Sequence, residues 1–208
     1  MRADAGIPDD PRCSELLDFW LGTSASDADV ILQRGSLWFG GGADVDASIR
    51  ARFGELREAA ITGLLDDWLA FARGRLALVI LVDQFSRNLF RADAHAFAHD
   101  GIALAWCKQG LDAGTDRALR PIERVFFYLP LEHSEVLADQ QRSVALFRAL
   151  PGEGGAGVHA AFANFLDYAQ RHRDIIARFG RFPHRNAVLG RPSTTQEIAF
   201  LGQSGSSF

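Results

Sequence analysis

The stretch that most constrains the fold of this chain is RLALVILVDQFSRNLFR, residues 75–91, in which a continuous apolar run leads directly into polar residues. Over so short a run, apolarity alone does not distinguish a buried strand from a buried helix. No glycine or proline interrupts the stretch, and Leu78, Val82 and Phe85 recur at helical steps of four and three. We therefore predict a single central helix that is buried on almost every side where it begins.

The length and composition of the chain fit one globular domain. It has 208 residues, of which 48% are hydrophobic and 23% charged, and its sixteen Phe and four Trp supply large side chains for a core. The formal net charge of -4 argues against general nucleic-acid binding, which normally requires a basic surface. We expect a single domain over residues 1–208, with PGEGGAG at residues 151–157 as a flexible internal connection.

The sequence contains no segment typical of membrane insertion or export. No apolar run approaches the roughly 18 residues that a membrane span requires, and the first residues lack the apolar segment of a secretion signal. Cys13 and Cys107 form neither a metal-binding motif nor a disulfide framework, so a reducing compartment is expected. These observations predict a cytoplasmic protein that binds neither a membrane nor nucleic acid.

Helical spacing and helix-end signals recur along the rest of the chain. Asp10 and Pro11 predict a helix start, and Gly22 predicts its end. A short helix is expected at 30–32, followed by a glycine-rich loop at 38–42. A further helical stretch is expected from Asp46 or Ser48 to residue 74, with Gly54 and Gly63 as candidate breaks. Helices are also expected at 97–110, where Gly110 is placed as a stop, at 121–130, which Pro130 ends or kinks, and at 136–150, 159–179 and 193–201. No segment alternates as a strand does, so we predict an all-α fold.

A cluster of polar residues, Asp83, Gln84, Arg87 and Asn88, occupies the second half of the predicted central helix. Asp83 and Arg87 are one helical turn apart, so they can pair. An aspartate beside an arginine stays ionised at neutral pH, which suits it to orient a histidine or bind a cation rather than to donate a proton. The cluster is either a structural network in the core, the interpretation we favour, or part of a functional site.

Residue types suited to acid-base chemistry follow later in the chain. Glu132, His133 and Glu135 qualify, but neighbouring positions on a helix point in different directions, so only some of them can converge. His172 lies on the apolar stripe of a predicted helix, where a core histidine is the simpler interpretation. The catalytic candidates from the sequence are Asp83, Glu132, His133, His172 and His184.

Two other motifs have simpler explanations than chemistry. Ser134 is interpreted as the N-cap of the helix that follows it, because serine strongly prefers that position. His95 and His99 have the spacing of two metal ligands on a helix, but Ala96 stands where the glutamate of an H-E-x-x-H motif would be. We therefore predict no metal site and no cofactor.

The clearest indication of a ligand type is a run of basic residues near the C-terminal end, which we call the basic run. Five arginines lie between Arg173 and Arg191, where Asp174 is the only acidic residue. Such an imbalance attracts anions, and arginine binds a carboxylate or phosphate through a planar pair of donors. Exposure to solvent, or pairing with acidic residues elsewhere in the chain, is the alternative. The ligand-binding candidates are Gln84, Arg87, Asn88, Arg178, Arg181, His184, Arg185, Asn186 and Arg191.

Several long motifs carry a family resemblance. LLDFW, SLWFG, LVDQFSRNLFR, YLPLEHSE and RFGRFPHRNAVLGR, in this order, resemble the bacterial family called domain of unknown function 924. The resemblance covers nearly the whole chain, and His95 and His99 fall outside its motifs. It implies antiparallel helix pairs in a tetratricopeptide-like right-handed superhelix, and it implies no activity. The tetratricopeptide period of about 34 residues is not visible in this sequence.

Three classes of function follow. The first, which we favour, is a binding module whose groove or pocket holds an anionic small molecule or an acidic peptide; a protein partner is a further alternative. The second is a hydrolase-like enzyme that uses the acidic residues and histidines for acid-base or metal-assisted chemistry. The third is a structural scaffold without a ligand. The sequence gives no indication of oligomeric state.

Overall fold

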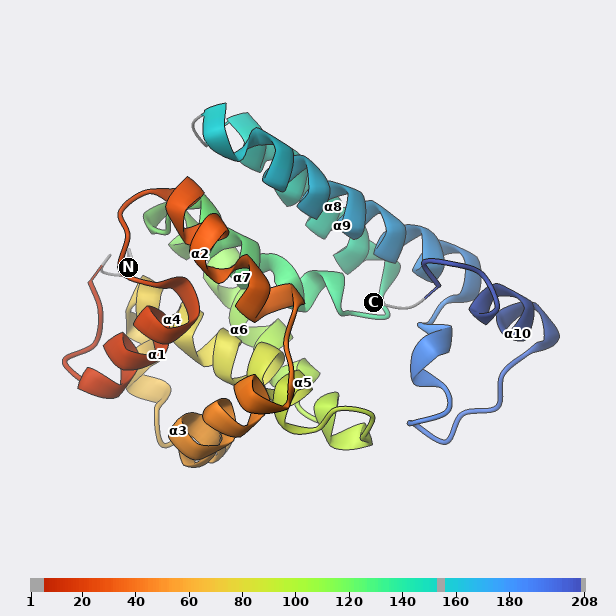
Figure 1. Ribbon diagram of the computed structural model, residues 1–208, viewed down its shortest axis with the longest axis horizontal. Helices are drawn as coiled ribbons and strands as arrows, with labels where there is room; N and C mark the ends of the chain where they lie inside the picture. The colour runs from red at the N-terminus through yellow and green to blue at the C-terminus, as the bar shows by residue number, and fades with distance from the viewer. Residues whose placement is uncertain (1–5, 153–155, 207–208) are drawn as a thin grey trace.

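The computed structural model describes residues 6–152 and 156–206. Within these ranges every regular element is helical, which confirms the predicted all-α class (Figure 1). The α-helices are α1 (Pro11–Leu21), α2 (Asp27–Phe39), α3 (Ala43–Ile61), α4 (Ala72–Val79), α5 (Phe85–Leu89), α6 (Asp100–Asp112), α7 (Pro121–Glu132), α8 (Leu137–Ala149), α9 (His159–Phe179) and α10 (Thr195–Leu201). Short 3-10 turns lie between them.

The predicted central helix is present, but it contains an irregular turn. A π-helical turn, η2 (Ile80–Gln84), joins α4 to α5, and the N–H of Phe85 donates to the carbonyl of Ile80, five residues earlier. The apolar residues from 76 to 82 are completely buried, and α3, α6 and α7 pack around the helix. Burying each such aliphatic side chain contributes about 1.5–3 kcal/mol, so this run anchors the whole fold.

A chain of aromatic rings connects α1, α2 and α7 to the central helix. The ring of Trp20 lies 5.3 Å from that of Phe85 and 5.7 Å from that of Phe126, in edge-to-face arrangements. Trp38 packs 4.7 Å from Phe126, and its indole N–H donates to the carbonyl of Trp20 at 2.9 Å. The predicted loop at 38–42 was therefore wrong for its first part, because these contacts hold the end of α2 in the helical conformation.

Other predicted helix bounds were wrong where a glycine was taken as a stop. Gly110 lies inside α6, where a Cβ atom would come within 2.6 Å of the ring of Phe127, so it permits close packing and does not end the helix. Gly54 lies inside α3 and does not break it. This helix begins at Ala43, not at Asp46 or Ser48, and ends at Ile61, close to the candidate break at Gly63 and well before residue 74. The helix α7 continues past Pro130 to Glu132.

The long helices α8 and α9 run side by side as an antiparallel pair (Figure 1). Gly180 ends α9 with φ 69, as predicted, because glycine adopts the left-handed conformation without strain. The connection predicted at 151–157 lies partly outside the described residues, which flank it with the turns Leu150–Gly152 and Ala156–Val158. The helix pair agrees with the family resemblance, whereas the superhelix remains an expectation.

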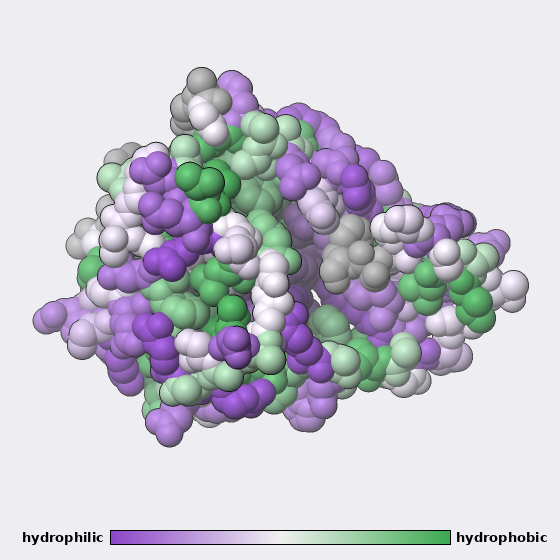
Figure 2. Space-filling view, viewed as in Figure 1, coloured by the Kyte–Doolittle hydropathy of each residue, from purple (hydrophilic) through white to green (hydrophobic). Residues whose placement is uncertain are grey.

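The C-terminal segment after Gly180 extends away from the central helices and carries α10 (Figure 1). Thr194 caps α10 in the predicted capping box with Glu197. Figure 2 shows the surface hollowed between the central body and this segment, with hydrophilic and hydrophobic residues along the edges. Within the described ranges, none of the helices is both long enough and apolar enough to cross a lipid bilayer.

Candidate functional site

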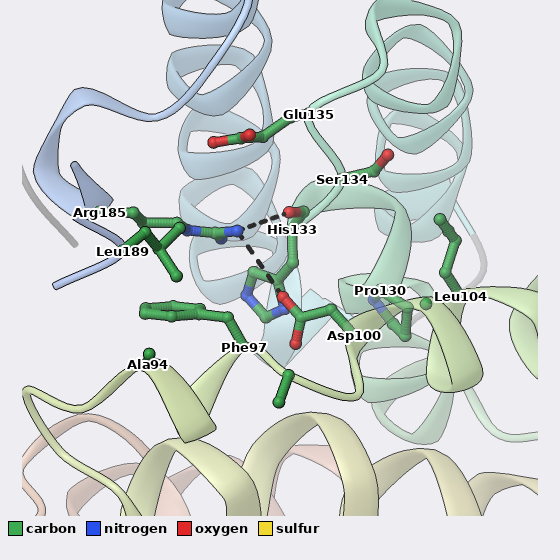
Figure 3. Close-up of a pocket in the computed structure, with 12 residues that line it drawn as sticks. Ala94, Phe97, Asp100, Leu104, Pro130, His133, Ser134, Glu135, Arg185 and Leu189 are labelled. Atoms are coloured by element: carbon green, nitrogen blue, oxygen red, sulfur yellow. Dashed lines mark hydrogen bonds and ion pairs between the residues drawn. The ribbon is translucent and has the colours of Figure 1, made fainter. Parts of the chain in front are cut away.

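A pocket of about 330 Å³ lies where the beginning of α6, the end of α7 and the C-terminal segment meet (Figure 3). Its wall combines apolar side chains with a few polar groups that converge from these three elements. The lining residues are Ala94, Phe97, Ala98, Asp100, Gly101, Leu104, Pro130, His133, Ser134, Glu135, Arg185 and Leu189. A largely apolar cavity with a few convergent polar groups is the usual form of a small-molecule site.

Asp83 lies behind the pocket and is completely buried. It belongs to the π-helical turn η2, so its side-chain direction differs from the one that a regular helix would give. One carboxylate oxygen accepts from Nδ1 of His133 at 2.8 Å, and the other accepts from Nε2 of Gln84 at 2.6 Å. Burial alone would raise the pKa of Asp83, but the charges of Arg87 and His133 and these hydrogen bonds hold it below its usual range.

His133 connects Asp83 to the pocket. It directly follows α7, and its side chain is 13% exposed. Because an ionised carboxylate can only accept, the bond to Asp83 places the imidazole proton on Nδ1 and leaves Nε2 as an acceptor. Burial and the charge of Arg87 lower the pKa of His133, although Asp83 opposes both. The ring is therefore neutral near pH 7.

Arg87 braces the site and has little capacity left for a ligand. Its guanidinium binds both oxygens of Asp100, at 3.0 and 3.1 Å, and donates to the carbonyls of Asp83 and Ala96 at 3.0 and 3.2 Å. The predicted pairing with the Asp83 carboxylate is present but longer, at 3.6 Å. Asp100, which the sequence analysis did not select, is thus the closest acidic partner of Arg87.

Arg185 is the cation of the pocket with the least compensation. Nη1 donates to the carbonyl of His133 at 3.1 Å and lies 3.6 Å from an oxygen of Asp100 (Figure 3). Nε is buried and has no hydrogen-bond partner among the described residues. The guanidinium carbon lies 4.7 Å from the centre of the Phe97 ring and 4.4 Å from that of the Phe182 ring, in cation–π contacts. Burial and the charge of Arg87 lower the pKa of Arg185 to about 10, so it stays protonated at neutral pH.

The other arginines of the basic run do not line the pocket. Arg181 forms two hydrogen bonds with Glu197, at 2.7 and 2.8 Å, and Arg191 forms two with Glu135, at 2.7 and 3.0 Å. Arg178 stacks on the ring of Phe179 at 4.6 Å. The acidic partners Glu135 and Glu197 lie outside the run in sequence. These pairs hold the C-terminal segment in place and thereby position Arg185.

Glu132 and His172 form a buried pair behind the pocket, outside its lining. His172 donates from Nδ1 to the carbonyl of Tyr168 at 2.9 Å, and Nδ1 lies 3.2 Å from the Glu132 carboxyl. Burial and the charge of Asp83 raise the pKa of Glu132 to about 8, and burial and His133 lower that of His172 to about 3. Both side chains are therefore neutral near pH 7. The rings of His133 and His172 are 6.3 Å apart.

The remaining ligand-binding candidates lie outside the pocket. The side chain of Gln84 donates to Asp83, that of Asn88 to Asp46 at 2.9 Å, and that of Asn186 to Ser193 at 3.1 Å. His184 packs against Phe182, and burial and the charge of Arg185 lower its pKa to about 4.

Ser134 lines the pocket but is not the N-cap of α8, so that prediction was wrong. The cap position belongs to Val136, whose N–H donates to the Ser134 hydroxyl at 3.2 Å, and the hydroxyl donates to Asp139 at 2.8 Å. Serine therefore closes the turn that precedes the helix, a role that involves the same type of side-chain hydrogen bond as an N-cap.

His95 and His99 do not lie on one helix. α6 begins only at Asp100, so the two histidines are not one turn apart on a helix. His95 pairs with Asp93 at 2.6 Å, and Nδ1 of His99 lies 3.2 Å from Arg57. Over residues 6–152 and 156–206, no three side chains of His, Cys, Asp or Glu are grouped so that they could hold a metal ion.

Comparisons with known proteins identify one family and one solved structure that are similar to this chain. The sequence pattern of a family described as "Bacterial protein of unknown function (DUF924)" matches residues 16–205. A solved structure, that of the protein of unknown function ATU0120 from Agrobacterium tumefaciens, is similar with a TM-score of 0.77 and 38% sequence identity, covering 91% of this chain and 96% of that one. No curated protein matches the chain.

Proposed function

The chain belongs to the DUF924 family of bacterial proteins of unknown function, and we propose that it binds a small anionic molecule in the pocket beside His133. The observation that carries this proposal is Arg185, a buried guanidinium in the pocket wall whose charge is incompletely compensated. A buried charge is costly unless it is paired and hydrogen-bonded, so the site gains stability when an anion enters.

The distribution of partners identifies Arg185 as the group that would hold the anion. Asp100 is already bound by two hydrogen bonds from Arg87, and its distance to Arg185 is longer, at 3.6 Å. Asp83 is occupied by His133 and Gln84, and Glu135 by Arg191. The guanidinium also packs on the rings of Phe97 and Phe182, which restrict the side chain, so little side-chain entropy is lost on binding.

The size of the pocket favours a small molecule over an acidic peptide. Its volume of about 330 Å³ lies at the lower end of the roughly 300–1,000 Å³ range of small-molecule sites. Phe97, Leu104 and Leu189 offer apolar contacts for a short carbon chain. A carboxylate or phosphate on such a chain fits both parts of the wall, with the anionic group at Arg185.

The test is a thermal-shift screen followed by calorimetry. Succinate, glutarate and methyl phosphate serve as anionic probes, and glutaramide serves as the uncharged control. A ligand bound only by the folded protein stabilises it by about 2.7 kcal/mol at a hundred times its Kd. Arg185→Gln is expected to weaken binding at least about tenfold, because a hydrogen bond to a charged group contributes about 1.5–3 kcal/mol.

Arg178→Gln is the matched control, since it removes a charge of the same basic run whose guanidinium stacks on Phe179 and lies outside the pocket. It is expected to leave the Kd unchanged. The proposal fails if none of the three anions binds the parent protein. It also fails if Arg185→Gln binds them with the affinity of the parent, as the control Arg178→Gln is expected to do.

A further inference from the structure

Two helix irregularities bring Asp83 and His133 together, although 50 residues separate them in the sequence. The π-helical turn directs the buried Asp83 toward the end of α7. Pro130 lies inside α7, where it removes one backbone hydrogen bond, and it lines the pocket next to His133. Both features reduce the regularity of a helix in the middle of the fold, and π-turns occur frequently at functional sites.

The pair has the arrangement of a histidine base with its orienting carboxylate. Asp83 fixes the tautomer through Nδ1, so the acceptor lone pair of the neutral ring is on Nε2. If Nε2 takes up a proton, the ionised Asp83 stabilises the resulting imidazolium, as the aspartate does in serine hydrolases. Because its pKa is lowered by burial and Arg87, His133 is unprotonated and ready to accept a proton at neutral pH.

We infer that this pocket hydrolyses an ester of a small anionic molecule, with His133 as the catalytic base and Asp83 as its positioning residue. The inference rests on the proposed anion site, since Arg185 would hold the anionic group while the ester lies beside His133. The nucleophile is water. Ser134, the hydroxyl-bearing residue in the wall, donates its proton to Asp139, and Cys13 and Cys107 are buried outside the pocket.

The reaction needs no oxidant, metal or cofactor. Nε2 of His133 takes a proton from a water molecule as the water oxygen bonds to the ester carbonyl carbon, and the carbonyl electron pair moves onto its oxygen. When this pair returns, the carbon–oxygen bond to the alcohol breaks, and the alcohol oxygen takes the proton from Nε2.

Two chromogenic esters test the inference on the full chain. The mono-4-nitrophenyl ester of glutarate carries a free carboxylate, and 4-nitrophenyl pentanoate has the same acyl length without it. We expect saturable release of 4-nitrophenol from the glutarate ester, slowed by at least about a hundredfold in His133→Gln, which is the lower end of the contribution of general-base catalysis. His95→Gln, at an exposed histidine outside the pocket, is expected to retain the parent rate.

Asp83→Asn separates positioning from a merely structural role. It is expected to lower kcat more than it raises KM and to change the pH profile of kcat, because the histidine loses its charged partner. Since these variants can also fold poorly, nitrogen-15 NMR of the parent protein gives a second reading. The imidazole of His133 is expected to carry its proton on Nδ1 at neutral pH and to titrate at Nε2.

The outcomes distinguish the inference from the proposed function on which it rests. If glutarate binds through Arg185 but the glutarate ester is not hydrolysed, or is hydrolysed equally by folded His133→Gln, the base is overturned and the binding proposal stands. A proton on Nε2 in the neutral ring also overturns it. Equal specificity for the two esters overturns the anionic substrate class. If no anion binds, the proposed function itself fails.

Discussion

Removing Arg87 should lower the stability of the protein, because this side chain connects the central helix to α6. In Arg87→Ala, Asp100 loses two hydrogen bonds, the carbonyls of Asp83 and Ala96 lose a donor, and the buried Asp83 carboxylate loses its nearest permanent positive charge. Breaking a buried ion pair from one side typically costs about 3–5 kcal/mol.

The lower end of that range applies here. The side chains of Arg87 and Asp100 are 24% and 23% exposed, so water partly screens the pair and can solvate Asp100 once Arg87 is gone. Asp83 keeps its hydrogen bonds to His133 and Gln84. We therefore expect a loss of about 3 kcal/mol, which for a chain of this size lowers the melting temperature by roughly 6–12 °C.

The assay is thermal and urea unfolding at neutral pH, with Arg142→Ala as the matched control. Arg142 pairs with Asp112 at 2.8 Å, but these side chains are 39% and 69% exposed, so its loss should cost less than about 1 kcal/mol. NMR should also show a higher pKa for His133 in Arg87→Ala, because the charge of Arg87 lowers it in the parent. Equal melting temperatures for both variants, with an unchanged His133 pKa, would refute the reasoning.

Two further predictions concern buried positions. The raised pKa of Glu132, about 8 against an ordinary 4.5, contributes stability that is present below about pH 4.5 and is lost as the pH rises through about 8. Glu132→Gln should remove this loss, so its melting temperature should exceed that of the parent at about pH 8 and match it at about pH 5; parallel curves would contradict the assignment. Gly110→Ala should destabilise the protein by about 1–3 kcal/mol, because its Cβ would overlap Phe127, whereas Gly54→Ala, with open space around it, should stabilise by about 0.5–1 kcal/mol in chemical denaturation.

Local signals predicted some of the helix ends, and tertiary packing decided the others. The starts at Pro11 and Thr195 and the end at Gly180 depend on a cap or a left-handed glycine within a few residues, which the sequence displays. The end of α2 depends on Trp38 packing against Phe126, a residue far away in the chain. The sequence does not distinguish a glycine that ends a helix from one that permits close packing between helices, so Gly110 was interpreted as a helix end.

The candidate site was predicted in its residue types but not in its pairing. Asp83 was selected because an aspartate beside an arginine stays ionised and can orient a histidine, and His133 was selected because its residue type suits acid-base chemistry. Their contact depends on a π-helical turn, which has no readable sequence signature at this position. Counting charges along the chain overestimated the uncompensated positive charge of the basic run, because Glu197 and Glu135, the partners of Arg181 and Arg191, lie 16 and 56 residues away from them in the sequence.

The position of Arg185 relative to His133 depends on two separately built parts of the fold. The central helices fix the histidine through Asp83, whereas Arg185 belongs to the C-terminal segment, beyond the pair of α8 and α9. Glu135 connects the two parts, because it lies two residues before the start of α8 and accepts hydrogen bonds from both Arg191 and the backbone N–H of Phe182. A rotation or shift of the C-terminal segment would therefore move Arg185, the anion-binding group, and would leave His133 in place. The contribution of the basic run to the pocket is thus mainly to position Arg185.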